Sequence, residues 1–118
     1  MASSEGRLFA AWDIVVVPFP YTDRLAEKRR PALVISNRSL ARHGVIWTAM
    51  ITSAENRSWV SDVSISDLER AGLPAPSVVR TAKIACIDPA RVLSRAGRLD
   101  RKAAALVAQR IASFLGSP

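Results

Sequence analysis

Hydrophobic residues fall into short runs along most of this chain and form a helical stripe only at its end. Six runs predict strands, because each is short, apolar or alternating, and bounded by turn-forming residues. These runs are Trp12–Val17, Arg30–Ser36, Val45–Ile51, Trp59–Ile65, Ser77–Ile87 and Arg91–Ser94. The polar segment Tyr21–Arg29 is expected to be a long loop between the first two strands.

Capping residues and residue spacing predict two helical segments. Ser66–Arg70 should form a single capped turn that ends at Gly72. The last element should be an amphipathic helix that begins at the N-cap Asp100 and ends at Gly116. Its apolar stripe consists of Leu99, Ala103, Leu106, Val107, Ile111 and Phe114. Short strands followed by one such helix predict an α+β fold, with the helix packed against a small, strongly curved sheet or barrel.

The length of 118 residues fits one domain, which we expect at residues 12–116 after a flexible N-terminal leader at residues 1–11. No apolar run approaches the ~20 residues that a transmembrane helix needs, and the leader lacks the apolar core of a secretory signal. Cys86 is the only cysteine and lies in an apolar, β-like run, where a buried structural thiol is expected. We therefore expect a cytoplasmic protein without a membrane segment.

The net positive charge of the chain indicates the kind of partner that it binds. Seventeen Lys and Arg against ten Asp and Glu give a formal net charge of +7 and a pI near 11.0. Two blocks supply most of it: Tyr21–His43 has six cations and two acids (+4), and Arg91–Arg110 has six cations and one acid (+5). This surplus predicts a polyanionic partner, nucleic acid first, or an acidic protein.

Three adjacent cations, Lys28, Arg29 and Arg30, stand where the second predicted strand begins. Pro31 favours an extended backbone at Arg30, so the guanidinium should be held at the rim of the sheet. There its planar fork of donors could grip a phosphate. The alternative is a solvated gatekeeper run in front of an aggregation-prone strand.

Counting residues excludes several kinds of catalyst. One histidine and one cysteine cannot build a common zinc site, and the five glycines are too far apart for a phosphate-binding loop. The carboxylates form no dense motif for two Mg²⁺ ions. His43 lies beside Gly44 in a turn-like segment, where a surface histidine is expected. We therefore expect no metal and no cofactor, so cleavage of nucleic acid would have to use RNA, whose 2′-OH can attack the adjacent phosphorus.

Four ordered segments carry a family resemblance. They are Asp13-Ile-Val-Val-Val-Pro-Phe19, Lys28-Arg-Arg-Pro-Ala-Leu-Val-Ile-Ser36, Ile51-Thr-Ser53 and Ser77-Val-Val-Arg-Thr-Ala-Lys-Ile84. Together with the C-terminal helix, this pattern resembles the MazF/PemK family of toxin ribonucleases. The resemblance implies an SH3-like barrel, a homodimer, sequence-selective cleavage of single-stranded mRNA, and inhibition by a cognate acidic antitoxin.

The resemblance also assigns roles to individual residues. Arg30 matches the family's catalytic arginine and would bind the phosphate, whereas Thr52 matches its catalytic threonine and would donate its hydroxyl to a non-bridging oxygen. Thr52 could instead only cap the end of a strand. Arg80 matches a basic position used for RNA, or else pairs with an acid across the sheet. The expected RNA-binding residues are Lys28, Arg29, Ser53, Arg80, Lys83 and Trp59.

The chain departs from the family pattern at several positions. Ala82 and Leu25 stand where some members have acids, Glu27 being the acid nearest to Leu25. Trp12 stands where relatives often have Gly. Trp47, inside a predicted strand, is expected in the core, whereas Trp59 is the better candidate for stacking on a base or contacting a partner.

Two other functions remain open at this point. The same barrel could poison DNA gyrase through a protein contact, as the related CcdB family does, since function does not follow from fold. The chain could also be a plain basic nucleic-acid-binding module, with salt-sensitive binding and no reaction products.

Overall fold

The computed structural model describes residues 8–19 and 28–118. Most of the predicted leader, most of the predicted loop Tyr21–Arg29, and the positions Leu25 and Glu27 lie outside the described residues. Of the leader, Phe9 is buried among core residues, and the backbone N–H of Ala10 donates to the carboxylate of Asp13. The domain boundary at residue 12 stays a prediction.

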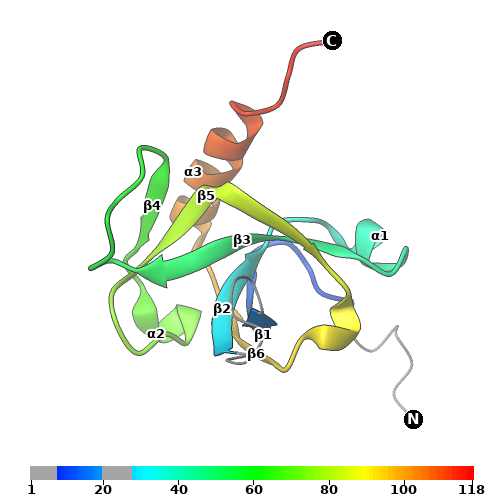
Figure 1. The fold of residues 1–118 in the computed structure, drawn as a ribbon, viewed down its shortest axis with the longest axis horizontal. Helices are drawn as coiled ribbons and strands as arrows, with labels where there is room; N and C mark the ends of the chain where they lie inside the picture. Colours follow the sequence, from blue (N-terminus) through cyan, green and yellow to red (C-terminus); the bar gives the residue numbers. More distant parts are fainter. Residues whose placement is uncertain (1–7, 20–27) are drawn as a thin grey trace.

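Within residues 8–19 and 28–118, a six-stranded sheet curls on itself (Figure 1). Every pairing is antiparallel, and the strand order is β4-β5-β3-β2-β1-β6. The strands are β1 (Asp13–Phe19), β2 (Lys28–Val34), β3 (Ile46–Ser53), β4 (Asp62–Ile65), β5 (Ser77–Ile87) and β6 (Ser94–Arg98). This architecture, completed by a C-terminal helix, confirms the predicted α+β fold.

Four helices among the described residues connect or cover the strands. They are α1 (Arg38–Ala41), α2 (Leu68–Ala71), the 3-10 helix η2 (Pro89–Arg91) and α3 (Arg101–Ala112). The predicted capped turn that ends at Gly72 is present as α2. The structure shows Asp67 as its N-cap and Gly72 in the left-handed conformation. Asp100 caps α3 through the backbone N–H of Ala103.

The curled sheet has an apolar core on each face. Leu33, Ile51 and Val79 lie on one face and pack with Val107 of α3. Val15, Ala32 and Val34 lie on the other face and pack with Phe9, Ala41, Ile46 and Val92. Because side chains alternate along a strand, neighbouring residues serve different cores. The helix therefore covers one face and leaves the other to the segments around it.

Most strand predictions hold, and the main errors occur where the apolar pattern is weak. Ser77–Ile87 is a strand over its full predicted length. The second strand begins at Lys28, so the three cations belong to it, and it ends at Val34. The prediction for Arg91–Ser94 was wrong, because Arg91 belongs to η2 and β6 begins at Ser94. Helix α1 was not foreseen.

Several predicted core side chains are exposed. Leu106 is 36% and Phe114 53% exposed, because α3 ends at Ala112 and its buried stripe is narrower than predicted. Cys86 is also exposed, and Trp47, its cross-strand partner, is 50% exposed. The expectation of a buried thiol and a core tryptophan was therefore wrong. The physical reason is that the core formed with α3 includes Val79 in the first half of β5 and does not extend to the second half.

Trp12 adopts the left-handed backbone conformation, with φ of +78°. Side chains with a Cβ disfavour this region, whereas glycine enters it freely. The conformation explains physically why a glycine would suit this position. In this chain the indole packs instead against the core beneath α3.

Candidate functional site

The register of the sheet decides which predicted site residues share a face. Ala32 pairs with Met50, and Met50 pairs with Arg80. Directly opposed residues lie on the same face, as do residues two apart along a strand. Arg30, Thr52 and Arg80 therefore lie on one face of the sheet, and α3 packs on the opposite one. We call the side of the sheet that carries these three residues the cationic face.

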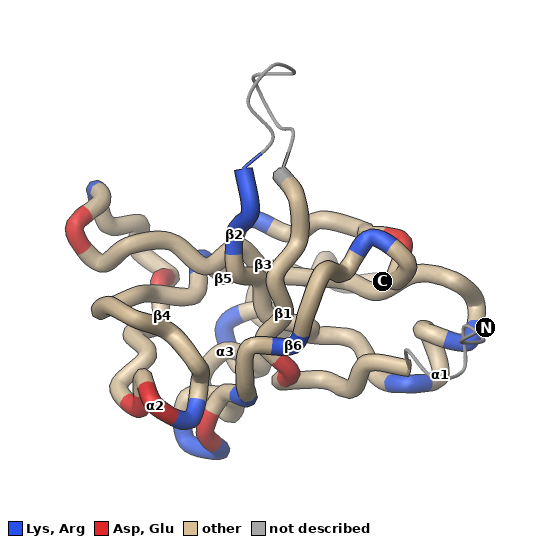
Figure 2. The backbone as a smooth tube through the Cα atoms, turned by 90° about the horizontal axis from the view of Figure 1, so that it is seen from below, with Lys and Arg blue, Asp and Glu red and all other residues tan. Residues whose placement is uncertain are grey.

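Arg30 lies at the rim of the cationic face, near the start of β2. It is opposite Val17 of β1, and it is partly exposed, whereas Lys28 and Arg29 before it are exposed. Figure 2 shows this basic stretch projecting at the beginning of β2. By alternation Lys28 shares the face of Arg30, and Arg29 belongs to the other face. The structure thus separates two neighbouring arginines that the sequence presents as one cluster.

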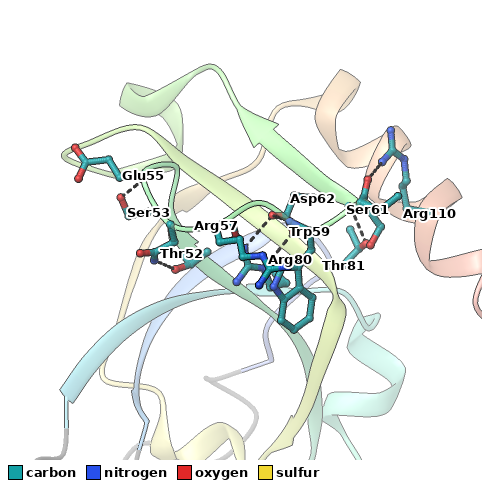
Figure 3. Close-up of polar contacts among 12 residues, drawn as sticks. Thr52, Ser53, Glu55, Arg57, Trp59, Ser61, Asp62, Arg80, Thr81 and Arg110 are labelled. Atoms are coloured by element: carbon teal, nitrogen blue, oxygen red, sulfur yellow. Dashed lines mark hydrogen bonds and ion pairs between the residues drawn. The ribbon is translucent and has the colours of Figure 1, made fainter.

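Thr52 lies beyond the same end of the β2–β3 pairing as Arg30. The last paired residues are Ala32 and Met50, so Arg30 and Thr52 are each two residues past that pair. Thr52 is only 7% exposed, and its Oγ1 accepts a hydrogen bond of 2.6 Å from Nδ2 of Asn56 (Figure 3). Its neighbour Ser53 faces away by alternation, and the Ser53 Oγ accepts from the backbone N–H of Glu55 at 3.1 Å. Ser53 is therefore not brought together with Thr52.

Arg80 is buried and pairs with Asp62 across β5 and β4. Its Nε and Nη2 donate to the two carboxylate oxygens of Asp62 at 3.2 and 3.0 Å. Nη2 also donates to the carbonyl of Arg57 at 2.7 Å, and the Trp59 ring centroid lies 4.4 Å from the guanidinium carbon. These contacts favour the cross-strand role for Arg80, the alternative that the sequence left open.

Two opposing effects act on the Asp62 carboxyl. Burial raises its pKa, whereas the hydrogen bonds from the Arg80 side chain and the Trp59 backbone, together with the Arg80 charge, lower it. The lowering effects prevail, and the pKa lies below the ordinary value of 3.8. Asp62 therefore stays ionised as the partner of Arg80 at neutral pH.

The remaining predicted RNA-binding residues lie around this pair. Trp59 is 43% exposed, and its backbone N–H donates to Asp62 at 2.9 Å. Lys83 is exposed in a bulge of β5, since Arg80 and Ile84 pair with the adjacent β3 residues Met50 and Ala49. The strand register that places Arg30, Thr52 and Arg80 on the cationic face therefore does not place Lys83 there.

A second group of cations is partly neutralised. The nearly buried Asp13 of β1 accepts hydrogen bonds from Arg95 at 3.1 Å and from Arg98 at 3.0 Å, both from β6. These two arginines belong to the more basic of the two charge blocks. Arg95 and Arg98 are therefore less available to a polyanion than their charges alone suggest.

The described part of the chain has neither a cluster of metal ligands nor a membrane-spanning helix. Nowhere in residues 8–19 and 28–118 do three His, Cys, Asp or Glu side chains gather as a metal site would require. No helix there has the length and apolar character needed to cross a membrane. His43 is exposed, as predicted for a surface histidine.

Two residues of this site could not be found from the sequence. Asn56 belongs to the turn after β3, and nothing in the pattern marks its side chain as directed at Thr52. Asp62 occupies an unremarkable position in an alternating segment. Only the register with β5 shows that it supplies the carboxylate beside Arg80.

The curled antiparallel sheet with a helix on one face defines a half-barrel α+β protein. It is similar to MazF from Deinococcus radiodurans (form I), with a TM-score of 0.73 and 23% identity over 93% of this chain and 98% of that chain. It is also similar to toxin MazF-mt6 from Mycobacterium tuberculosis, with a TM-score of 0.68 and 22% identity over 86% and 93% of the two chains. A third similar structure is described as an endoribonuclease in complex with its cognate antitoxin, from a mycobacterial species (TM-score 0.73, 15% identity, 93% and 97% covered).

The family follows from a direct match of the sequence. Residues 10–115 match the model of the PemK-like, MazF-like toxins of type II toxin-antitoxin systems. This chain therefore belongs to that family. No curated protein matches it. The identities to the three solved structures are low, so those likenesses establish the fold.

Proposed function

We propose that this toxin is a metal-independent endoribonuclease that cuts single-stranded RNA at selected sequences. The observation that carries the proposal is the placement of Arg30 and Thr52 on the same face and at the same end of adjacent strands. One residue brings a planar cation and the other a hydroxyl, which are the groups needed to bind and stabilise a phosphate. The endoribonuclease named among the similar structures supports the same reaction class.

The reaction uses the substrate's own nucleophile. The 2′-oxygen of one ribose attacks the adjacent phosphorus as its proton is removed, and the bond to the 5′-oxygen breaks as that oxygen gains a proton. The products are a 2′,3′-cyclic phosphate and a 5′-hydroxyl. Arg30 binds the phosphate through two N–H donors, and Thr52 donates its hydroxyl to a non-bridging oxygen on which charge builds.

The partners of this activity follow from charge and exposed surface. The antitoxin complex among the similar structures and the +4 block near Arg30 support binding of an acidic antitoxin, which would compete with RNA. The exposed Trp47 and Ile84 lie on one face of β3 and β5 and would be covered in a homodimer. Because mRNA is the proposed substrate, the proposed compartment is the cytoplasm.

The first test incubates the purified protein with a long single-stranded RNA in EDTA and maps the new 5′ ends. The wild type should produce discrete cuts, and Arg30→Ala should lower the rate by about 100-fold or more. Arg29→Ala is the matched control, since it removes the same charge from the opposite face. Because Arg29 is also a predicted RNA-binding residue, its loss should raise KM but leave kcat within about threefold of the wild type.

Three results of this test would contradict the proposal or one part of it. Intact RNA across many sequence contexts would contradict the proposal and leave a gyrase poison or a binding module. Equal cutting by Arg30→Ala and the wild type would reject Arg30 as catalytic. A loss in EDTA that added Mg²⁺ restores would reject the metal-independent mechanism.

A further inference from the structure

We infer that Asn56 is a positioning residue, which fixes the Thr52 hydroxyl as a hydrogen-bond donor toward the scissile phosphate. This inference rests on the proposed ribonuclease function and adds a residue to its site. It starts from the bond of 2.6 Å between Nδ2 of Asn56 and Oγ1 of Thr52.

The direction of this hydrogen bond limits what the hydroxyl can do. A threonine hydroxyl has one proton to donate and two lone pairs that accept, whereas the amide nitrogen of asparagine only donates. Asn56 therefore occupies a lone pair of Oγ1, and the Thr52 proton must point elsewhere. Donation into Oγ1 also polarises the O–H group and strengthens the bond that it donates.

The surroundings of Thr52 make this orientation matter. The residue is 7% exposed, so its hydroxyl has few water partners. The cationic face on which it lies also carries Arg30. A phosphate held by Arg30 would offer its non-bridging oxygens as acceptors. Because Asn56 donates to Oγ1, Thr52 does not use its own proton in a hydrogen bond to the Asn56 side chain. That proton is therefore available to the phosphate.

The turn that carries Asn56 is fixed on both sides. The backbone N–H of Asn56 donates to the carbonyl of Ser53 at 3.1 Å. The carbonyl of the next residue, Arg57, accepts from Arg80 at 2.7 Å, and Arg80 is itself locked to Asp62. In Figure 3, dashed lines join Arg80 to Asp62 and Arg57, and the labelled Thr52 lies to their left. The buried ion pair therefore serves the site indirectly, by holding the residue beside Asn56.

The test compares Asn56→Ala with the nearly isosteric Asn56→Asp. The alanine variant leaves Thr52 free to rotate, and we expect kcat to fall about tenfold while KM stays within about twofold. The aspartate variant can only accept at neutral pH, so it draws the Thr52 proton toward itself and should lower kcat further than alanine does. Glu55→Gln, in the same exposed turn, is the control, and thermal melting checks that all variants fold.

A double-mutant cycle separates positioning from direct contact with RNA. In a Thr52→Val background the hydroxyl is gone, so Asn56→Ala should have no further effect on kcat. Additive losses would show that Asn56 acts on the RNA by itself, which overturns the inference. Unchanged kcat in both Asn56 variants would also overturn it. Absence of cleavage by the wild type would instead reject the ribonuclease function itself.

Discussion

Arg30 and Arg80 lie on the same face of one sheet, yet the fold treats them in opposite ways. Arg80 is 8% exposed and bound by Asp62, by the carbonyl of Arg57 and by the ring of Trp59. Arg30 is partly exposed at the rim. The same side chain is a structural clamp in one place and a candidate for ligand binding in the other.

The difference comes from the cross-strand neighbours. Arg80 lies between Met50 of β3 and Asp62 of β4, so a carboxylate stands directly beside it. Arg30 is opposite Val17 of β1, which offers no charge. A buried arginine needs a partner, whereas a rim arginine keeps its hydration until a ligand arrives. Register, and not residue type, therefore decides which cation is available.

The largest expected effect comes from breaking the ion pair between Arg80 and Asp62, which we call the clamp. Arg80→Leu leaves Asp62 ionised and nearly buried without its cation, which should lower the free energy of unfolding by about 3–5 kcal/mol. Arg30→Leu, the matched change at the rim, should lower it by less than about 1 kcal/mol. Urea unfolding of both variants measures the difference. Equal losses would show that the two arginines do not differ in their structural role.

The double variant Arg80→Leu/Asp62→Leu sharpens this result. Replacing both partners removes the buried, unpaired charge, so part of the lost stability should return. A double variant less stable than Arg80→Leu alone would mean that Asp62 stabilises the fold through contacts other than the ion pair. The backbone N–H of Trp59 is the other donor to its carboxylate.

The lowered pKa of Asp62 gives the clamp a pH dependence. Because the folded-state pKa lies below 3.8, the unfolded state takes up this proton first as the pH falls. The contribution to stability is therefore complete above about pH 5 and is lost as the pH falls through the folded pKa. Asp62→Asn should be less stable at neutral pH and should show a shallower loss on the acid side. Unfolding measured from about pH 6 to pH 3 checks this, and parallel curves would contradict it.

The apolar pattern predicted the strands better than it predicted their surroundings. β5 was found over its whole length because Val and Ile mark it, whereas β6 carries Arg95, Gly97 and Arg98 and has no such mark. Gly97 is needed there for space, since a Cβ would lie 2.3 Å from the carbonyl oxygen of Arg70. That demand is set by α2, which the local sequence of β6 cannot reveal.

The same limit applies to the site. Arg30 and Thr52 were predicted as site residues because they resemble a family pattern, and the register places them on one face at the same end of adjacent strands. The contacts of Asn56 and Asp62 depend on a turn and on strand pairing, so no local pattern marks them. Trp47 and Cys86 were misjudged because periodicity identifies a strand but not which half of it a helix covers.

Loss of the Arg98 side chain should lower the free energy of unfolding by less than loss of Arg80 and by more than loss of Arg30. Arg98 and Arg95 are about half exposed and share the buried Asp13, so each can partly replace the other. Arg98→Ala should therefore lower the free energy of unfolding by about 1–2 kcal/mol, less than the loss expected for Arg80. Urea unfolding of Arg98→Ala, Arg95→Ala and the double variant measures the redundancy. A double variant equal to the sum of the single ones would mean that the two arginines act independently.

The smallest expected effect concerns the salt dependence of RNA binding, measured in a Thr52→Val background, in which cleavage is slow compared with binding. Each phosphate contact on single-stranded nucleic acid contributes a slope of about −0.7 to the logarithm of the binding constant against the logarithm of salt concentration. If Arg30 binds one phosphate, Arg30→Ala should reduce the slope by about that amount. Arg80→Leu, compared at temperatures where both variants are folded, should leave the slope unchanged, because its guanidinium is already held by Asp62. A reduced slope for Arg80→Leu would show that RNA reaches the clamp, and that burial in the free protein does not keep this arginine from its ligand.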